Sequence, residues 1–241
     1  MLTLCALILL SACGPSKEID LTADWSVEKF YDEARSELDS GNYLTAIEYY
    51  ETLESRFPFG RYAMQAQIDV AYAYFKFDEP DSAITALDRF IKLHPRHPAV
   101  DYAYYLKGLV NFQRGGTILD VIVERDLSTF DRNLLLRAYN DFKLLTQRFP
   151  SSEYVTDARK RMIFLRNELA RADFAVANYY ASLEAWVAVT GRTRFILLNY
   201  QGTEVIEATL ELQLKAYQTL GLEQLARDTQ RIIALNFETS S

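Results

Sequence analysis

The 241-residue sequence has few turn-forming residues, few cysteines and no excess of positive charge. Its nine glycines and six prolines fall well short of the combined share of about 12% that is usual in proteins, which disfavours a sandwich or barrel with many tight turns. Its two cysteines provide no disulfide framework. The 26 lysines and arginines are outnumbered by 33 aspartates and glutamates, giving a net charge of −7, whereas a nucleic-acid binder normally carries a basic face. We therefore expect an all-α protein that binds no nucleic acid.

The first twelve residues form a short apolar segment that contains only one threonine and one serine. A helix that crosses a membrane needs about 20 apolar residues, so this segment is too short to span one. The sequence LSACG at positions 10–14 is similar to the bacterial lipobox, in which small residues precede a cysteine that is acylated and becomes the first residue of the mature protein. We expect residues 1–12 to be a lipoprotein signal peptide, Cys13 to carry the lipid anchor and residues 13–24 to be a linker.

Two further features of this leader concern its start and its destination. The first basic residue is Lys17, whereas a signal peptide opens with lysine or arginine, so we expect the true start codon to lie upstream. Gly14 follows the cysteine where an aspartate would stand in a retained lipoprotein, which is typical of lipoproteins released to the outer membrane. The predicted location is the outer membrane, with the chain facing the periplasm. An ordinary secretory signal or a buried apolar strand is the alternative.

An internal repeat runs through the rest of the chain. Apolar-periodic runs end at Phe57–Pro58, His94–Pro95 and Phe149–Pro150, and the first two prolines are 37 residues apart. Counting back from each proline gives the alternation of small and large residues that is typical of a tetratricopeptide repeat. The residues that fit this pattern are Phe30, Ala34, Gly41, Tyr43, Ala46, Tyr50 and Leu53, then Ala71, Ala83, Leu87 and Phe90, then Ala138, Phe142 and Leu145.

Small residues at these positions let two helices approach closely, and each such pair must stack on its neighbours to bury its apolar face. We therefore predict a right-handed superhelix of about five tetratricopeptide-like helix pairs, or about ten helices. The N-terminal repeats would occupy residues 25–150 and the C-terminal repeats residues 151–238. The helices expected in the C-terminal part span 152–180, 184–199, 203–220 and 222–236.

The third repeat is interrupted. Its first helix is expected at 99–113, with Gly108 in the small position, but its second helix begins only near Arg132. The insertion at 114–131 carries five large apolar residues, which a solvated loop does not need. It either packs on the scaffold or meets a partner, and the sequence leaves both readings open.

A binding surface is expected on the concave side, which the first helix of each pair lines. The sequence holds 16 tyrosines and 14 phenylalanines, and rigid rings with a polar tip suit recognition of extended peptides. Several of these rings could instead fill space between helices. When the three clear copies of the repeat are aligned, the positions expected to face the groove are Tyr31, Arg35, Ile68, Tyr72, Phe75, Tyr102, Tyr105, Leu109 and Phe112. Phe59, Gly60 and Tyr62 are expected at its entrance.

Several longer motifs are more specific than the repeat pattern. They are FPFGRY at 57–62, AYAYF at 71–75, DRFI at 88–91, HPRHP at 94–98 with DY at 101–102, RFPSS at 148–152 with Tyr154, and ARKR at 158–161 followed by LR at 165–166. With these motifs the chain resembles the BamD family, the lipoproteins of the outer-membrane β-barrel assembly machinery, from Cys13 to about Leu222.

The resemblance implies a scaffold without enzymatic activity. It implies contacts with BamA through the C-terminal repeats and with the lipoproteins BamC and BamE. It also implies that unfolded outer-membrane β-barrel proteins are received on the N-terminal repeats. The family has an arginine that faces BamA, and Arg192 matches it. The sequence departs from the family pattern at three places, with Asn133–Leu134 in place of an Asp-Pro, Gln201 in place of a proline and Glu184 in place of a glycine. These differences concern the BamA face more than the fold.

Enzyme and metal readings have little support in the sequence. His94, His97 and Asp101 could form a metal trio, but both histidines lie in a proline-rich turn and no third histidine exists. No glycine-rich phosphate loop occurs, and the basic run Arg159–Arg161 is expected to be a solvated helix face. We predict no cofactor. The alternatives to barrel assembly are a general repeat lipoprotein that coordinates peptidoglycan synthesis or cell division, and a periplasmic hydrolase or its regulator.

Overall fold

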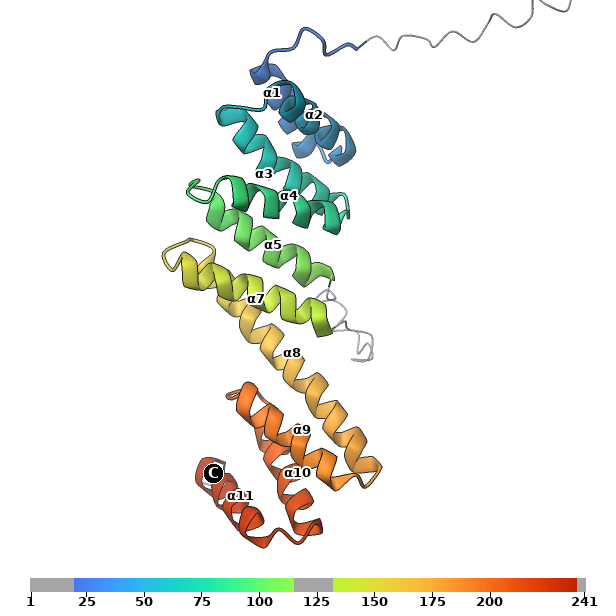
Figure 1. Ribbon diagram of the computed structural model, residues 1–241, viewed down its shortest axis with the longest axis vertical. Helices are drawn as coiled ribbons and strands as arrows, with labels where there is room; N and C mark the ends of the chain where they lie inside the picture. The colour runs from blue at the N-terminus through green and yellow to red at the C-terminus, as the bar shows by residue number, and fades with distance from the viewer. Residues whose placement is uncertain (1–19, 115–131, 238–241) are drawn as a thin grey trace, which may run out of the picture.

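The computed structural model describes residues 20–114 and 132–237, and these form ten α-helices without a β-strand (Figure 1). Their bounds are α1 Val27–Asp39, α2 Tyr43–Arg56, α3 Arg61–Lys76, α4 Pro80–Leu93, α5 Val100–Arg114, α7 Arg132–Arg148, α8 Val155–Ser182, α9 Trp186–Asn199, α10 Ile206–Thr219 and α11 Glu223–Asn236. The predicted all-α fold is confirmed. The signal peptide, Cys13 and the insertion after Arg114 lie outside the described residues.

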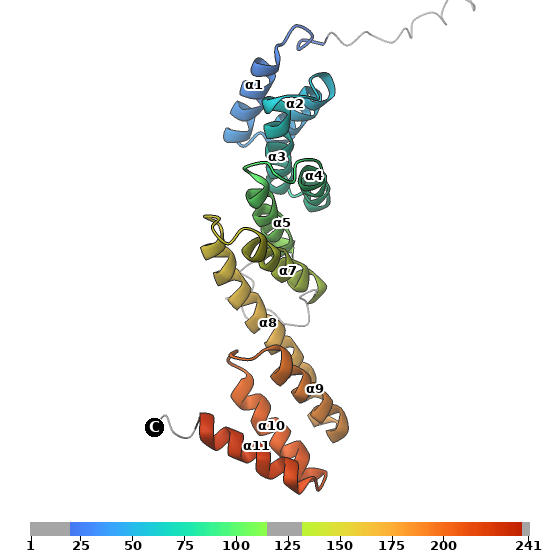
Figure 2. The ribbon, with the colours of Figure 1, turned by 60° about the vertical axis from the view of Figure 1, so that its left-hand side comes forward.

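Consecutive helices pack as pairs, α1 with α2, α3 with α4, α5 with α7, α8 with α9 and α10 with α11. The pairs stack in chain order into an elongated array, with α1 at one end and α11 at the other, as both views show (Figures 1 and 2). The helix α8 is the longest and packs against both α7 and α9. Each second helix ends just before its proline, because α2, α4 and α7 stop at residues 56, 93 and 148.

The small and large positions of the repeat pack as predicted. Every alanine of the pattern is fully buried, and the large residues beside them fill the core of each pair. The fully buried members are Ala34, Ala46, Ala71, Ala83 and Ala138 with Phe30, Tyr50, Leu53, Leu87, Phe90, Phe142 and Leu145. Gly41 has a different role, because it is exposed in the α1–α2 turn with a φ of 82°, a left-handed conformation that favours glycine.

The helices α5 and α7 approach closely at Gly108. A Cβ atom on Gly108 would lie 2.5 Å from Cε1 of Phe142, so only glycine fits at this position. The helix α7 begins at Arg132, where the sequence predicts the restart of the third repeat. In the parts of the chain that the structure describes, no helix is both long enough and apolar enough to cross a membrane.

The Gly108→Ala substitution tests the packing of the third repeat. We expect it to lower the free energy of unfolding by about 1–3 kcal/mol, because the added methyl group overlaps the buried Phe142 ring. The matched control is Gly191→Ala in α9, where a Cβ meets nothing within 4 Å. That change should leave stability unchanged or raise it by up to about 1 kcal/mol, since alanine is the better helix former. Equal melting temperatures for the two variants would contradict the packing.

Candidate protein-binding surface

Six tyrosines follow one another along the first helices of the array. We call them the tyrosine stripe, and they are Tyr31, Tyr62, Tyr72, Tyr102, Tyr105 and Tyr154. Each is partly exposed, and they come from α1, α3, α5 and the residue that precedes α8. The rings of Tyr105 and Tyr154 stack with centroids 4.8 Å apart, and Tyr102 lies 5.5 Å from Tyr154. The stripe therefore crosses four successive helix pairs.

A buried aspartate in α3 orients the N-terminal end of the stripe. The Tyr31 hydroxyl donates to Oδ2 of Asp69 at 2.9 Å, and the Gln65 amide donates to Oδ1 at 3.0 Å. Burial raises the pKa of the Asp69 carboxyl even though these two hydrogen bonds oppose the rise. Burial and then the charge of Asp69 raise the pKa of Tyr31 to about 12, so this hydroxyl stays protonated and donates at neutral pH.

A second aspartate, in α8, orients the other end. The Tyr105 hydroxyl donates to Oδ2 of Asp157 at 2.7 Å, and Nε of Arg161 donates to the same oxygen at 2.5 Å. Burial acts to raise the pKa of Asp157, but the hydrogen bonds from Arg161 and Tyr105 outweigh it and lower that pKa. The Arg161 guanidinium also lies 5.0 Å above the Phe112 ring. Arg161 is thus part of the site, which corrects its prediction as a purely solvated residue.

The predicted groove residues have three different placements. Tyr31, Tyr62, Tyr72, Tyr102 and Tyr105 lie together on the stripe. Phe75 is partly buried beside Tyr72, with ring centroids 6.4 Å apart, and Leu109 is also partly buried. Arg35 is exposed and pairs with Asp39 at 3.2 Å. In the α2–α3 turn, Phe59 is 89% exposed, and Gly60 has a φ of 102°.

Two predicted groove residues are buried instead. Phe112 is 7% exposed, and its ring packs edge-on against Phe142 at 6.4 Å and Phe164 at 5.8 Å. Ile68 is 1% exposed. The prediction that they face a groove is wrong, because Phe112 packs against rings of both α7 and α8, and Ile68 belongs to a core cluster with residues of α4 and α5. The repeat register also missed Tyr154, which belongs to the stripe, and Asp69 and Asp157, which accept hydrogen bonds from its hydroxyls.

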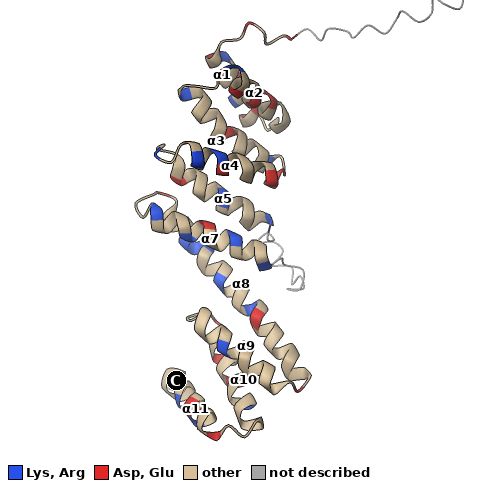
Figure 3. Ribbon diagram, in the orientation of Figure 1, with Lys and Arg blue, Asp and Glu red and all other residues tan. Residues whose placement is uncertain are grey.

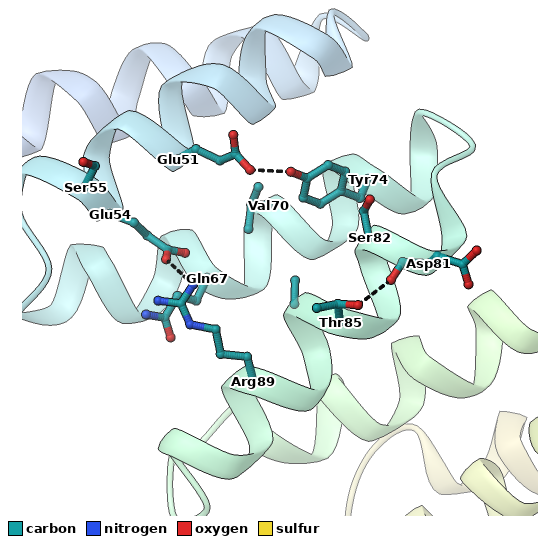
Figure 4. A pocket seen from close by; sticks show the side chains of 11 residues that line it. Glu51, Glu54, Ser55, Gln67, Val70, Tyr74, Asp81, Ser82, Thr85 and Arg89 are labelled. Carbon is teal, nitrogen blue, oxygen red and sulfur yellow. Dashed lines mark hydrogen bonds and ion pairs between the residues drawn. The ribbon is translucent and has the colours of Figure 1, made fainter.

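A separate cavity of about 610 Å³ lies between α2, α3 and α4 (Figure 4). Most of the residues that line it are polar, among them Glu51 and Glu54 from α2 and Arg89 from α4. Arg89 pairs with Glu54 at 3.4 Å, and the Tyr74 hydroxyl donates to Glu51. Burial raises the pKa of Glu54, and Arg89 partly offsets that rise. Arg89 and Glu54 thus form an ion pair within this cavity, while Asp81 of its wall pairs with Arg114.

Arg192, the predicted partner contact, is tied to a buried carboxylate. Asp173 in α8 is 5% exposed at its side chain and accepts a hydrogen bond from the Tyr200 hydroxyl at 2.8 Å. It also accepts from Nη2 of Arg132 at 3.2 Å, and Nη1 of Arg192 lies 4.0 Å away. The Arg192 guanidinium lies 6.0 Å from the ring centroid of Tyr180. Asp173 therefore joins α7, α8 and α9 and holds Arg192 partly exposed at the surface.

The two histidines of the proline-rich turn have ordinary packing roles. Nε2 of His94 lies 3.0 Å from Oε1 of Gln67, and both imidazoles lie against the Phe90 ring. Over residues 20–114 and 132–237, no group of three histidine, cysteine, aspartate or glutamate side chains is placed to hold a metal ion.

Stacked helix pairs with a row of partly exposed tyrosines define a helical repeat protein. The sequence comparisons make this class specific. The model of the YfiO family, described as outer membrane lipoprotein, matches residues 23–232, so the chain belongs to this family and is associated with the outer membrane.

Two curated relatives carry the same name. A protein of Neisseria meningitidis serogroup A is 45% identical over the whole of this chain and 91% of its own length. A protein of Vibrio cholerae is 39% identical over 97% of this chain and 96% of its own length. Both are named outer membrane protein assembly factor BamD. The resemblance found in the motifs is confirmed by these matches.

Removal of the Asp173 carboxylate tests the junction that holds Arg192. We expect Asp173→Ala to lower the free energy of unfolding by about 1–3 kcal/mol, because it leaves the buried Tyr200 hydroxyl without a partner and removes the carboxylate that two partly exposed arginines share. The control is Asp81→Ala, which removes an ion pair with Arg114 whose aspartate is 86% exposed. Its cost should stay within about 1 kcal/mol. Urea unfolding measures the free energy of unfolding of both variants. An equal loss of stability in the two would contradict the role of Asp173.

Proposed function

We propose that this protein assists the assembly of outer-membrane β-barrel proteins by binding alone. The observation that carries the proposal is the full-length similarity to relatives named outer membrane protein assembly factor. In the proposal, lipid on Cys13 tethers the chain to the outer membrane so that it faces the periplasm. The tyrosine stripe receives an extended segment of an unfolded barrel protein, and the C-terminal helices dock BamA. BamC and BamE would be further partners where they are present.

The stripe has the chemistry that extended peptides need. Its rings offer large contact areas with only two side-chain torsions each, so little conformational entropy is lost on binding. Hydrogen bonds to Asp69 and Asp157 already fix Tyr31 and Tyr105. Such preorganisation lowers the cost of association. Burial, followed by the neighbouring tyrosines Tyr72 and Tyr154, also raises the pKa of Tyr102, which favours a neutral surface of rings over a reactive phenolate.

The C-terminal half has the features of a protein-docking surface. Large apolar side chains are exposed on α8, α9 and α11, and soluble chains rarely expose many such residues together without a partner. The most exposed are Ile163, Tyr179, Val187, Leu198 and Leu235. Arg192 lies on the same helix as Val187 and Leu198, and its planar guanidinium can bind a carboxylate through two hydrogen bonds. These features support α9 as the BamA contact.

Replacing one tyrosine of the stripe tests client binding. We expect Tyr72→Ala to weaken binding of a peptide with an aromatic C-terminus by about tenfold, since one well-packed ring contributes about 1–2 kcal/mol. The control is Leu44→Ala, which removes an exposed side chain of α2 outside the stripe and outside the C-terminal helices and should leave affinity unchanged. Fluorescence anisotropy with the full chain in detergent measures the dissociation constant of the peptide for each variant.

The same variants test the function in cells. After depletion of the wild-type chain, the Tyr72→Ala chain should leave less β-barrel protein inserted in the outer membrane than the Leu44→Ala chain. Normal insertion after depletion alone would contradict the proposal. A peptidoglycan or division defect in that case would favour the general repeat lipoprotein.

Charge reversal on α9 tests the BamA contact separately. Arg192→Glu should reduce capture of the periplasmic domains of BamA by at least about tenfold, because it places a carboxylate beside Asp173 and removes the donor fork. The matched control is Arg194→Glu, an exposed arginine of the same helix. Equal loss in both variants would indicate a diffuse charge effect and contradict a specific role of Arg192.

A further inference from the structure

A row of exposed cations follows one edge of the array. Because successive helices run in alternating directions, the turns that join one helix pair to the next all lie at the same edge, on the left of Figure 1. Lysines and arginines gather at this side of α3, α4, α7 and α8 (Figure 3). We call them the basic edge, and its exposed members are Arg61, Lys92, Arg96, Arg148, Arg159 and Lys160. The first three of these turns, at 57–60, 94–99 and 149–154, contain a single acidic residue, Glu153.

The six cations of the basic edge have no carboxylate partner among the described residues. The Arg61 guanidinium lies 4.7 Å over the Tyr62 ring, and that of Arg148 lies 5.6 Å from the Tyr104 ring centroid, so both contact neutral groups. By contrast, the α3–α4 turn at the opposite edge exposes two acidic residues in succession, at 78 and 79. The net charge of −7 is therefore unevenly distributed over the array.

Helix stability does not account for all of these cations. Lys92 and Arg148 lie in the last turns of α4 and α7, where the helix dipole favours a positive charge. Arg61 is the first residue of α3, where the same dipole opposes one. Arg159 and Lys160 follow one another near the start of α8 and repel each other. Exposed charges of one sign that the fold does not need indicate a partner of the opposite sign.

The N-terminal segment that the structure describes is attached to the same edge. Arg56, the last residue of α2, pairs with Asp20, and its Nη1 donates to the carbonyl oxygen of Thr22 at 2.8 Å. The chain from Cys13 to Asp20 can extend over at most about 25 Å. Lipid on Cys13 would thus hold a membrane surface within about 25 Å of Asp20 and so close to the basic edge.

We infer that the basic edge contacts the anionic phospholipid headgroups of the membrane to which Cys13 tethers the chain. The inference rests on the proposed function, because it uses the lipid on Cys13. Lipid fixes one point of the chain, whereas cations along three successive turns fix the direction of the whole array. None of the six lines the cavity between α2, α3 and α4, and charges spread in this way suit a flat surface. Contact along this edge leaves the faces of the first helices accessible to a client.

Energy transfer from the two ends of α4 tests this orientation. The full lipidated chain carries a dye on Leu93→Cys at the basic edge or on Glu79→Cys at the opposite edge, and the vesicles carry an acceptor on their headgroups. The ends of α4 are about 20 Å apart. On phosphatidylcholine vesicles with about 30% phosphatidylglycerol, we expect at least about twofold higher transfer from position 93 than from position 79. On phosphatidylcholine alone, the two positions should give similar transfer.

A charge reversal assigns this difference to the basic edge. Arg159→Glu with Lys160→Glu, in a turn remote from both dyes, should remove most of the twofold difference on the anionic vesicles. The matched control is Arg227→Glu with Arg231→Glu, two exposed arginines of α11 whose reversal changes the net charge equally. It should keep the difference. Salt at about 0.5 M should also remove the difference in the unaltered chain, which tests the charge effect without any substitution on the edge.

The outcomes separate the basic edge from the lipid anchor. If the chain floats with both kinds of vesicle but the two dyes transfer equally on each, the inference is overturned and the anchor stands. The edge would then be left for an acidic protein. A difference that persists on neutral vesicles, or after reversal of Arg159 and Lys160, would also overturn the inference. Failure to float with neutral vesicles would contradict the lipid anchor itself and overturn the inference with it.

Discussion

The whole array depends on the close approach of helices at positions where the side chain is small. Fully buried alanines lie where α1 packs on α2 and where α3 packs on α4, and Gly108 lies against the Phe142 ring in the third pair. A helix that packs in this way has a fixed rotation about its axis. Because α1, α3, α5 and α8 are each fixed by their second helices, their remaining faces align and the tyrosines among them form one stripe.

Hydrogen-bonded carboxylates connect one pair to the next at three places. Asp69 accepts from Tyr31 across α1 and α3, Asp157 accepts from Tyr105 across α5 and α8, and Asp173 joins α7, α8 and α9. Two of these acceptors orient rings of the binding surface, and the third holds Arg192. The contacts that set the spacing of the repeats thus also set the geometry of the proposed sites. Changes at Asp69 or Asp173 should therefore affect stability and recognition together, whereas changes at exposed rings should affect recognition alone.

Most of the fold could be predicted from the sequence, because small and large residues recur at helical spacing and prolines mark the ends of second helices. The restart of the third repeat at Arg132 was predictable for the same reason. The site was only partly predictable. Tyr31 and Asp69 are 38 residues apart and Tyr105 and Asp157 are 52 apart, so no local spacing reveals these pairs. Phe112 was wrongly assigned to the groove because the repeat pattern describes only the packing of α5 within its own pair. It does not show that α8 also covers the end of α5.

Site-specific photo-crosslinking tests most directly whether clients bind the face made by the first helices. A photoreactive phenylalanine analogue would replace Tyr72 or Tyr102 on the stripe, or Leu44 or Leu144 on the second helices α2 and α7, where both leucines are exposed. The account predicts that an unfolded barrel protein crosslinks from the two stripe positions and not from the two leucine positions. Crosslinks that form mainly from Leu44 and Leu144 would contradict it.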